Sequence, residues 1–168
     1  MQDNKELLSV LSLVGLGFLA GKIISQPSAN IFNEKVKKRA KTLIKFGIKV
    51  PQGFSRLARN TLNGSIKCYL FDLRIPACIM AARAVEIILR KKYEEETNTH
   101  EKKVKFEDLI NWANQQGLFK GLDDIQIRYI QRARNYMVHD IVSDLDSISV
   151  LNIISAAIKI IGKIEKQV

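Results

Sequence analysis

Four polar residues near the end of one predicted helix have the types and the spacing that acid–base chemistry on a phosphate requires. Arg128, Arg132, Asn135 and His139 follow one another at intervals of four, three and four residues, which places them on one line of a helix. A histidine near a helix C-terminus holds its proton more readily, because the helix dipole favours a cation there. The line is either a catalytic face or an ordinary solvated face, and the histidine favours catalysis.

Arg134 lies in the same segment but off this line. It is about 100° around the helix axis from Asn135, so Arg132 is the easier neighbour of His139. Arg134 reaches His139 through the length of its side chain, or through a partner chain that brings a second groove to it. The other histidine, His100, lies in a charged stretch with no residue beside it that indicates a role.

No motif for a metal or a cofactor accompanies these residues. The chain contains no G-x-x-x-x-G-K-[ST], G-x-G-x-x-G or H-E-x-x-H sequence. Cys68 and Cys78 lie in apolar surroundings without a Cys-x-x-Cys or Cys/His cluster, so we expect buried reduced thiols. The sequence therefore predicts a site with no metal and no cofactor.

The elements that must position the site are predicted to be all-α. Apolar residues make up 46% of the chain and recur at intervals of three and four, with no clean alternation. We expect a linker at residues 26–30, and then a helix that Asn33 caps and Gly47 ends. The further expected elements are a helix over 54–72, a long helix opened by Pro76, a charged loop over 94–105, a short helix ended by Gly117, the motif helix from Asp123–Asp124, and a final apolar helix over 148–166.

The net charge of +10 is concentrated in one part of the chain. Residues 22–74 contain twelve Lys and Arg against only Glu34 and Asp72, which accounts for the whole surplus. Such a segment is suited to an anionic partner. Its basic helix is either a solvated amphipathic helix or one that binds RNA or anionic lipid, through Lys35, Lys37, Lys38, Arg39, Lys41 and Lys45.

The first 25 residues form a separate hydrophobic segment. Residues 7–21 carry no charge, and the apolar length through residue 24 reaches about 18 if Lys22 snorkels. The bases that follow would keep the rest of the chain in the cytoplasm, tethered to the inner face of the membrane. The alternative is a helix buried by the domain or by a dimer partner. The predicted organisation is thus residues 1–25, a basic segment over 26–53, and a helical domain over 54–168.

Two sequence patterns resemble one known superfamily. "RNYMVH", which begins at Arg134, is similar to the R-N-x-x-x-H signature of HEPN domains. "PACIMAARAVEIILRKKY", which begins at Pro76, is similar to the A-x-x-x-x-R-A-x-E-x-x-L helix of one prokaryotic HEPN branch. The order of the expected elements is also that of the branch, and the resemblance covers about residues 54–166.

The resemblance implies a helical bundle that cleaves RNA without a metal, in defence or toxin biology. It assigns catalysis to Arg134 and His139 and a supporting role to Asn135. It also implies a homodimer and an additional defence-system or antitoxin partner. The tyrosine that related toxins carry two positions after the histidine is replaced by Ile141, so regulation by its modification is not expected.

Three hypotheses follow from the sequence. The first is a HEPN-type endoribonuclease that acts through 2′-hydroxyl attack at a dimeric Arg/His site, with Arg132 and Arg128 in support. The second is a non-catalytic module that binds nucleic acid or a nucleotide. The third is a membrane-tethered adaptor that only dimerises.

Overall fold

The described part of the chain is all-helical, as predicted. The computed structural model describes residues 27–98, 104–122, 124–135 and 145–165, and the side chains from residue 34 onward. Its helices are α3 (Pro27–Lys45), α4 (Arg56–Leu70), α5 (Arg74–Thr97), α6 (Phe106–Gln115), α7 (Asp124–Asn135) and α8 (Ser147–Ile164). The apolar segment over 7–24 lies outside the described residues.

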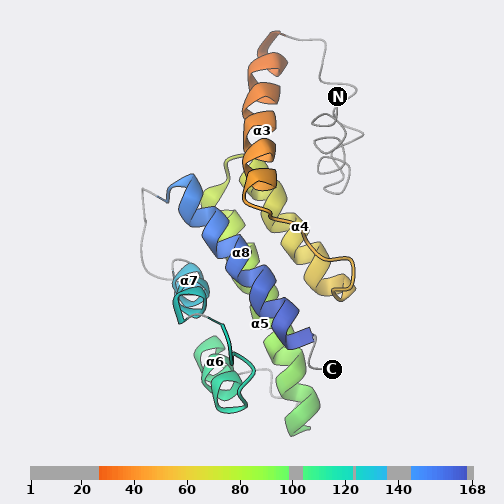
Figure 1. Ribbon diagram of the computed structural model, residues 1–168, viewed down its shortest axis with the longest axis vertical. Coiled ribbons are helices and arrows are strands. Elements are labelled where there is room, and N and C mark those ends of the chain that lie inside the picture. The colour runs from red at the N-terminus through yellow and green to blue at the C-terminus, as the bar shows by residue number, and fades with distance from the viewer. Residues whose placement is uncertain (1–26, 99–103, 123, 136–144, 166–168) are drawn as a thin grey trace.

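Helix α5 is the centre of the bundle, because α4, α6, α7 and α8 all pack on it. Figure 1 shows α4, α5 and α8 side by side, with α3 at one end of the molecule. Small residues on α5 let α4 approach closely, and the buried Ser65 hydroxyl of α4 donates a hydrogen bond of 2.6 Å to the carbonyl of Ala77. The core is therefore built around the helix that the Pro76 motif predicted.

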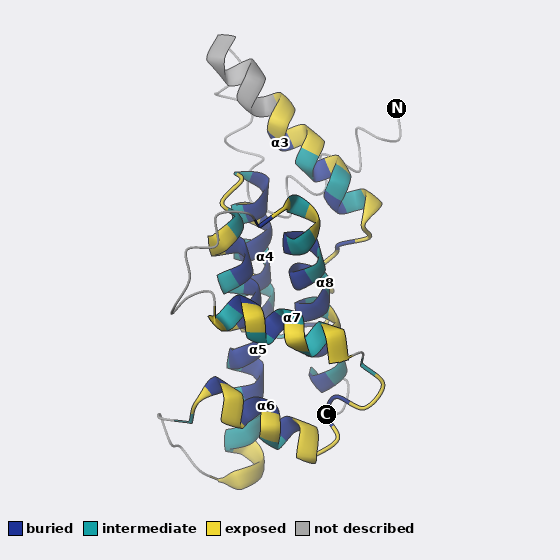
Figure 2. Cartoon of the chain, turned by 90° about the vertical axis from the view of Figure 1, so that its left-hand side faces the viewer, coloured by how far each residue is buried: buried dark blue, intermediate teal, exposed yellow. Residues whose placement is uncertain are grey.

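Helices α6 and α7 run across the long helices on one side of the bundle (Figure 2). Of α7, Ile130 and Ala133 are fully buried, and α7 packs on both α5 and α8. The spacing also places Ile125, Tyr129 and Ala133 on one face; Ala133 is buried and Tyr129 is partly buried, but Ile125 is 62% exposed. The inward face of α7 thus includes Ala133 and Ile130, and Arg134 follows one turn after Ile130.

Three helices end in the same backbone motif. After α3, Gly47 adopts a φ of +64°, and the amides of Gly47 and Ile48 bond back to the carbonyls of Ile44 and Leu43. This is a Schellman ending, in which a left-handed residue satisfies the last carbonyls. Gly117 ends α6 in the same way. Both glycine stops were predicted.

At the end of α4 the left-handed position is taken by Asp72, with φ +63°. Its carboxylate is 2.7 Å from Arg39 of α3 and 3.0 Å from Arg74 of α5. These two ion pairs offset the cost of placing a residue with a Cβ in this conformation. Asp72 thereby joins three helices.

Some predicted boundaries were wrong. The expected linker at 26–30 is helical from Pro27, so Asn33 lies inside α3 and is not its cap. Proline fits there because the first helical positions need no amide partner. The expected loop at 94–105 is helical as far as Thr97. There, ion pairs one turn apart, Lys91 with Glu95 and Lys92 with Glu96, extend α5.

Helix α8 is long and apolar enough, by composition alone, to be a candidate membrane-spanning helix. Among the described residues, the segment Ser147–Glu165 is the one long and apolar enough to cross a bilayer, and half of its apolar window is buried within the structure. Its contacts with α5 and α7 are those of a core helix. Its apolar sequence predicts the most buried element or partly a dimer face, and nine of its 18 residues are buried.

Candidate functional site

A buried carboxylate on α5 gathers three arginines. Glu86 is only 4% exposed. Its Oε1 lies 3.1 Å from Nη1 of Arg83 and 3.3 Å from Nη2 of Arg90, and its Oε2 lies 3.4 Å from Nε of Arg134. A buried carboxylate is strongly disfavoured unless it is paired. Glu86 therefore fixes Arg134 of the motif helix against α5.

The packing of α7 explains why Arg134 takes this place. Ile130 lies one turn before Arg134 on the same side of the helix and is fully buried. Because Ile130 points into the core, the side chain one turn later points toward α5 and meets Glu86. The side chain of Arg134 as a whole remains 31% exposed although its Nε is buried, so it can pair with Glu86 and still reach a solute.

The cluster carries a surplus of positive charge. One carboxylate faces three guanidiniums, whose side chains are 55%, 24% and 31% exposed for Arg83, Arg90 and Arg134. Arg90 also donates a hydrogen bond of 2.9 Å to the carbonyl of Val104, before α6. Guanidinium groups match the oxygens of a phosphate in planar, two-point contacts. The cluster is thus able to hold a phosphate at the α5–α7 junction.

The predicted line on α7 is only partly described. Arg128, Arg132 and Asn135 are exposed, on the side of the helix away from Ile130. The expected proximity of Arg132 to His139 stays a prediction, and among the described residues of α7 it is Arg134 that pairs with the α5 carboxylate. His139 and Ile141 lie outside the described residues, as does His100.

Three residues of the cluster were not among the predicted site residues. Glu86, Arg83 and Arg90 stand on one stripe of α5 in the sequence, an acid between bases at helical spacing. The sequence signal for the cluster is an acid among the apolar residues in the middle of α5. Such an acid is rarely buried without a charged partner, and the two bases on its stripe are candidates.

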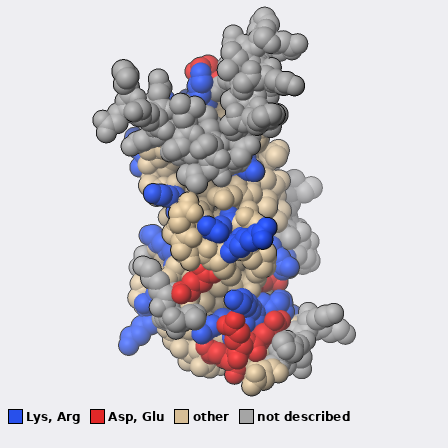
Figure 3. Space-filling model, turned by 90° about the vertical axis from the view of Figure 1, so that its right-hand side faces the viewer, with Lys and Arg blue, Asp and Glu red and all other residues tan. Residues whose placement is uncertain are grey.

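The basic helix α3 presents one lysine face. Val36, Ala40 and Leu43 are buried against the bundle, and at 100° per residue the opposite side carries Lys38, Lys41 and Lys45, with Lys35 at its edge. These four lysines are exposed; we call them the α3 lysine face. Figure 3 shows Lys and Arg side chains over most of the height of one side of the molecule, while acidic side chains gather mainly in its lower part.

Two residues predicted for that basic surface have structural partners. Arg39 donates a hydrogen bond of 3.1 Å to the carbonyl of Leu70 and pairs with Asp72 at 2.7 Å, and its side chain is only 19% exposed. It therefore joins α3 to α4, which corrects its assignment as an anion-binding residue. Lys37 is exposed and pairs with Glu34 at 2.9 Å, a surface pair of little energetic weight.

Both cysteines are free thiols. Cys78 is buried, as expected, and burial raises its pKa to about 12. Cys68 is half-buried, its pKa is also raised by burial, and its thiol lies 3.8 Å from the sulfur of Met80. Within the described residues, no group of three or more His, Cys, Asp or Glu side chains is placed to hold a metal ion.

Comparison with family models, with curated proteins and with solved structures gives no match to this chain.

Proposed function

We propose that this protein is a metal-independent endoribonuclease of HEPN type. The observation that carries the proposal is the buried Glu86, which holds Arg134 at the α5–α7 junction. Arg134 is the first residue of the R-N-x-x-x-H pattern, and Glu86 is the acid of the A-x-x-x-x-R-A-x-E-x-x-L pattern. Each of the two sequence patterns thus contributes one residue of this ion pair.

The proposed reaction needs no group beyond protein side chains. The 2′-hydroxyl of the RNA attacks the adjacent phosphorus, and His139 accepts the proton of that hydroxyl. The bond from phosphorus to the 5′-oxygen breaks, and the leaving oxygen takes a proton from a second histidine. The products are a 2′,3′-cyclic phosphate and a 5′-hydroxyl. Arg134 stabilises the charge that develops on the phosphate oxygens.

Glu86 is a positioning residue in this scheme, since it acts through Arg134. A guanidinium held by a buried carboxylate loses less conformational freedom when the phosphate binds, which is the advantage of preorganisation. Arg83 and Arg90 keep the local charge positive, so that Glu86 does not repel the RNA. Asn135 is proposed to support the site from the end of α7.

Two proton transfers call for two histidines, so the active form is proposed to be a homodimer in which two motif helices face one groove. The remaining residues of the site, Arg128 and Arg132, lie on the exposed side of α7. We assign them to RNA contact outside the reacting phosphate. A defence-system or antitoxin partner belongs to the same proposal.

Cleavage of a mixed-sequence RNA by the full chain in EDTA tests the proposal. His139→Ala and Arg134→Ala should each lower the rate by at least about 100-fold, the lower range for loss of an acid–base group or a charge-stabilising donor. Arg59→Ala is the control, because it removes one arginine outside the Glu86 cluster, whose side chain donates hydrogen bonds to Gln52. Equal rates in all four proteins would refute the assignment.

A second candidate function is binding to an anionic surface through the α3 lysine face. The observation that favours it is geometric: the four exposed lysines lie on the side of α3 away from its packing face, with Lys35 at the edge of that side. The apolar residues 7–24, which come just before α3 in sequence, make a membrane containing anionic lipid the proposed surface. We therefore place the protein in the cytoplasm, at the inner face of the cell membrane.

Sedimentation with vesicles tests this second function. The full chain should bind vesicles containing 30% phosphatidylserine, and replacing Lys35, Lys38, Lys41 and Lys45 by glutamine should weaken binding at least tenfold, since each base near such a surface contributes about 1 kcal/mol. A variant with Lys67, Lys91, Lys92 and Lys120 replaced has the same net charge and serves as the control. Equal loss in both would show that net charge alone is responsible.

A further inference from the structure

A groove crosses the C-terminal half of α8, at the other end of α7 from Arg134. Its volume is about 690 Å³, within the usual range of sites for small molecules. One wall comes from the segment before α4 and the other from the turn before α7 and the first turn of α7 itself. None of its lining residues belongs to the Glu86 cluster.

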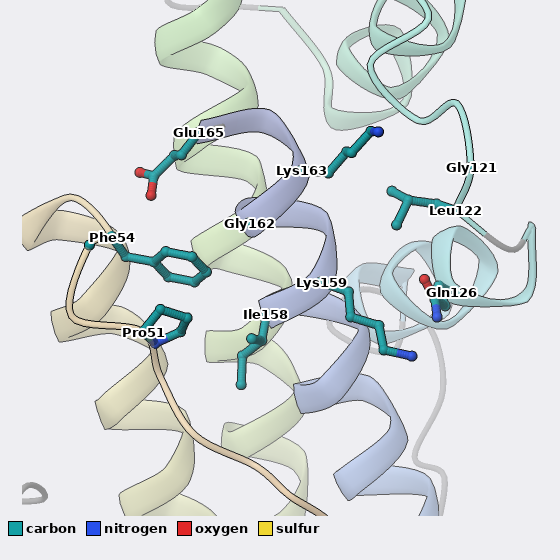
Figure 4. A pocket seen from close by; sticks show the side chains of 11 residues that line it. Pro51, Phe54, Gly121, Leu122, Gln126, Ile158, Lys159, Gly162, Lys163 and Glu165 are labelled. Atoms are coloured by element: carbon teal, nitrogen blue, oxygen red, sulfur yellow. The ribbon is translucent and has the colours of Figure 1, made fainter. Parts of the chain in front are cut away.

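The two ends of the groove differ in chemistry (Figure 4). Pro51, Phe54 and Ile158 form an apolar end. At the other end, the side chains of Lys159 and Lys163 leave α8 on the side of Leu122 and Gln126. Gly162 lies between the two ends, and a Cβ there would stand 3.4 Å from the Phe54 ring. A glycine at this position lets the Phe54 ring pack closely against α8.

The polar end is formed by two lysines and one glutamine. Among the described residues, neither Lys159 nor Lys163 has an ion-pair partner. Oε1 of Gln126 is buried and has no hydrogen-bond partner within the described part of the chain. A buried acceptor without a donor carries a cost of desolvation. Within the described part of the chain, the two lysines are therefore placed to bind an anion. Oε1 of Gln126 is placed to accept a hydrogen bond from a hydroxyl or an N–H group.

The acid in the groove is already engaged. The carboxylate of Glu165 accepts hydrogen bonds of 3.2 and 3.3 Å from the backbone amide of Ser55, just before α4. Figure 4 shows Glu165 on the Phe54 side of α8, with Lys159 and Lys163 on the other side. Its charge thus does not cancel theirs.

We propose that this groove binds a nucleotide. The base lies against Pro51, Phe54 and Ile158, a ribose hydroxyl donates to Gln126 Oε1, and the phosphate lies between Lys159 and Lys163. A fatty acid would satisfy the apolar end and the lysines but offers no donor to Gln126, so the buried acceptor selects the nucleotide. The proposal does not depend on the ribonuclease activity proposed above.

Calorimetric titration of the full chain with AMP and UMP tests the proposal. Replacing Lys159 and Lys163 together by glutamine should raise the dissociation constant about fivefold or more, from the loss of two exposed charge contacts. Lys67→Gln, on the exposed surface of α4, should leave it unchanged. The absence of AMP and UMP binding at 5 mM, or equal binding by the double variant, would overturn the proposal.

Gln126→Leu gives a second readout that needs no ligand. Removing a buried acceptor without a partner should raise the melting temperature of the free protein, while AMP binding weakens. A lower melting temperature would mean that Gln126 serves the fold, which would contradict its assignment to the ligand. The two effects in opposite directions distinguish a binding residue from a structural one.

Two further titrations identify the source of the nucleotide. If a tetranucleotide RNA binds the wild type more tightly than AMP, and the lysine double variant loses this binding, the groove takes one unit of an RNA chain. If AMP binds as tightly as the RNA, the ligand is a free nucleotide. Binding of decanoate in place of either nucleotide would refute the choice of ligand.

Discussion

The pair of Glu86 and Arg134 should be measurably coupled in the stability of the protein. The two charged atoms are 3.4 Å apart, and at this distance Coulomb's law gives about 5 kcal/mol for an effective dielectric constant of about 20 and about 1 kcal/mol for about 80. Glu86 is buried but Arg134 is 31% exposed, so solvent screens part of the attraction. We expect a coupling free energy of about 1.5 kcal/mol.

The chain contains a matched control for this measurement. Lys91 and Glu95 of α5 are 3.5 Å apart, with side chains 65% and 51% exposed. The distance is almost the same, but this pair is exposed and lies within one helix, so its coupling should be about 0.3–0.5 kcal/mol. The comparison thus holds the distance between the charges nearly constant.

Two double-mutant cycles give both values. The first uses Glu86→Gln and Arg134→Met, and the second uses Glu95→Gln and Lys91→Met, with urea unfolding followed by far-UV circular dichroism. Glu86→Gln alone should cost about 2 kcal/mol or more, because Arg83 and Arg90 lose the same partner. A coupling in the first cycle no larger than in the second would refute the reasoning that burial of Glu86 fixes Arg134.

Three further predictions concern other parts of the fold. Hydrogen bonds from Ser149 hold the pKa of Asp146, the cap of α8, below its usual 3.8. The ionised cap therefore stabilises the fold above about pH 4, and this contribution is lost as the pH falls through the lowered folded-state pKa. Thermal melts from pH 7 to pH 2.5 should show a step in melting temperature that Asp146→Asn removes. Asp72→Asn keeps a residue that tolerates a positive φ but breaks the pairs with Arg39 and Arg74, so urea melts should show a loss of about 1 kcal/mol, and no loss would mean that these pairs do not join α3 to the bundle. Cys78, with its pKa of about 12, should react with Ellman's reagent at pH 8 only as fast as the protein unfolds, and faster labelling would contradict its burial.

The sequence predicted the helices and their ends best where a single residue type dictates the backbone. Gly47 and Gly117 end helices at positions of positive φ, and the helix opened by Pro76 is the central one. The end of α4 was placed within two residues, although Asp72 takes the left-handed position there. An aspartate is not a strong stop signal, and here its conformation depends on arginines from two other helices.

Which side of α7 faces the core could not be predicted from α7 alone. Ile125 and Ile130 are equally apolar in sequence, but the first is 62% exposed and the second fully buried. The choice between them depends on the shape of the α5–α8 surface, and it carries Arg134 inward. The role of Arg39 was missed for the same reason, because its partners on and after α4 are distant in sequence.

Of the Glu86 cluster, only Arg134 was among the predicted site residues, and its catalytic role stays a prediction. Arg134 was assigned to catalysis by resemblance and is indeed the motif arginine in contact with α5. Glu86 was noticed only as part of a stripe, because a sequence does not reveal which charged residue becomes buried. The central claim is that the arginine held by Glu86, and not its exposed neighbour on α7, acts on the phosphate.

Single-turnover cleavage of RNA in EDTA by Arg134→Ala and Arg132→Ala, beside the wild type, tests that claim most directly. The account predicts 2′,3′-cyclic phosphate products from the wild type, a rate lower by at least about 100-fold in Arg134→Ala, and a rate within about tenfold of wild type in Arg132→Ala, which loses only an exposed contact to RNA. Cleavage that survives Arg134→Ala, or that is lost in Arg132→Ala alone, would contradict it.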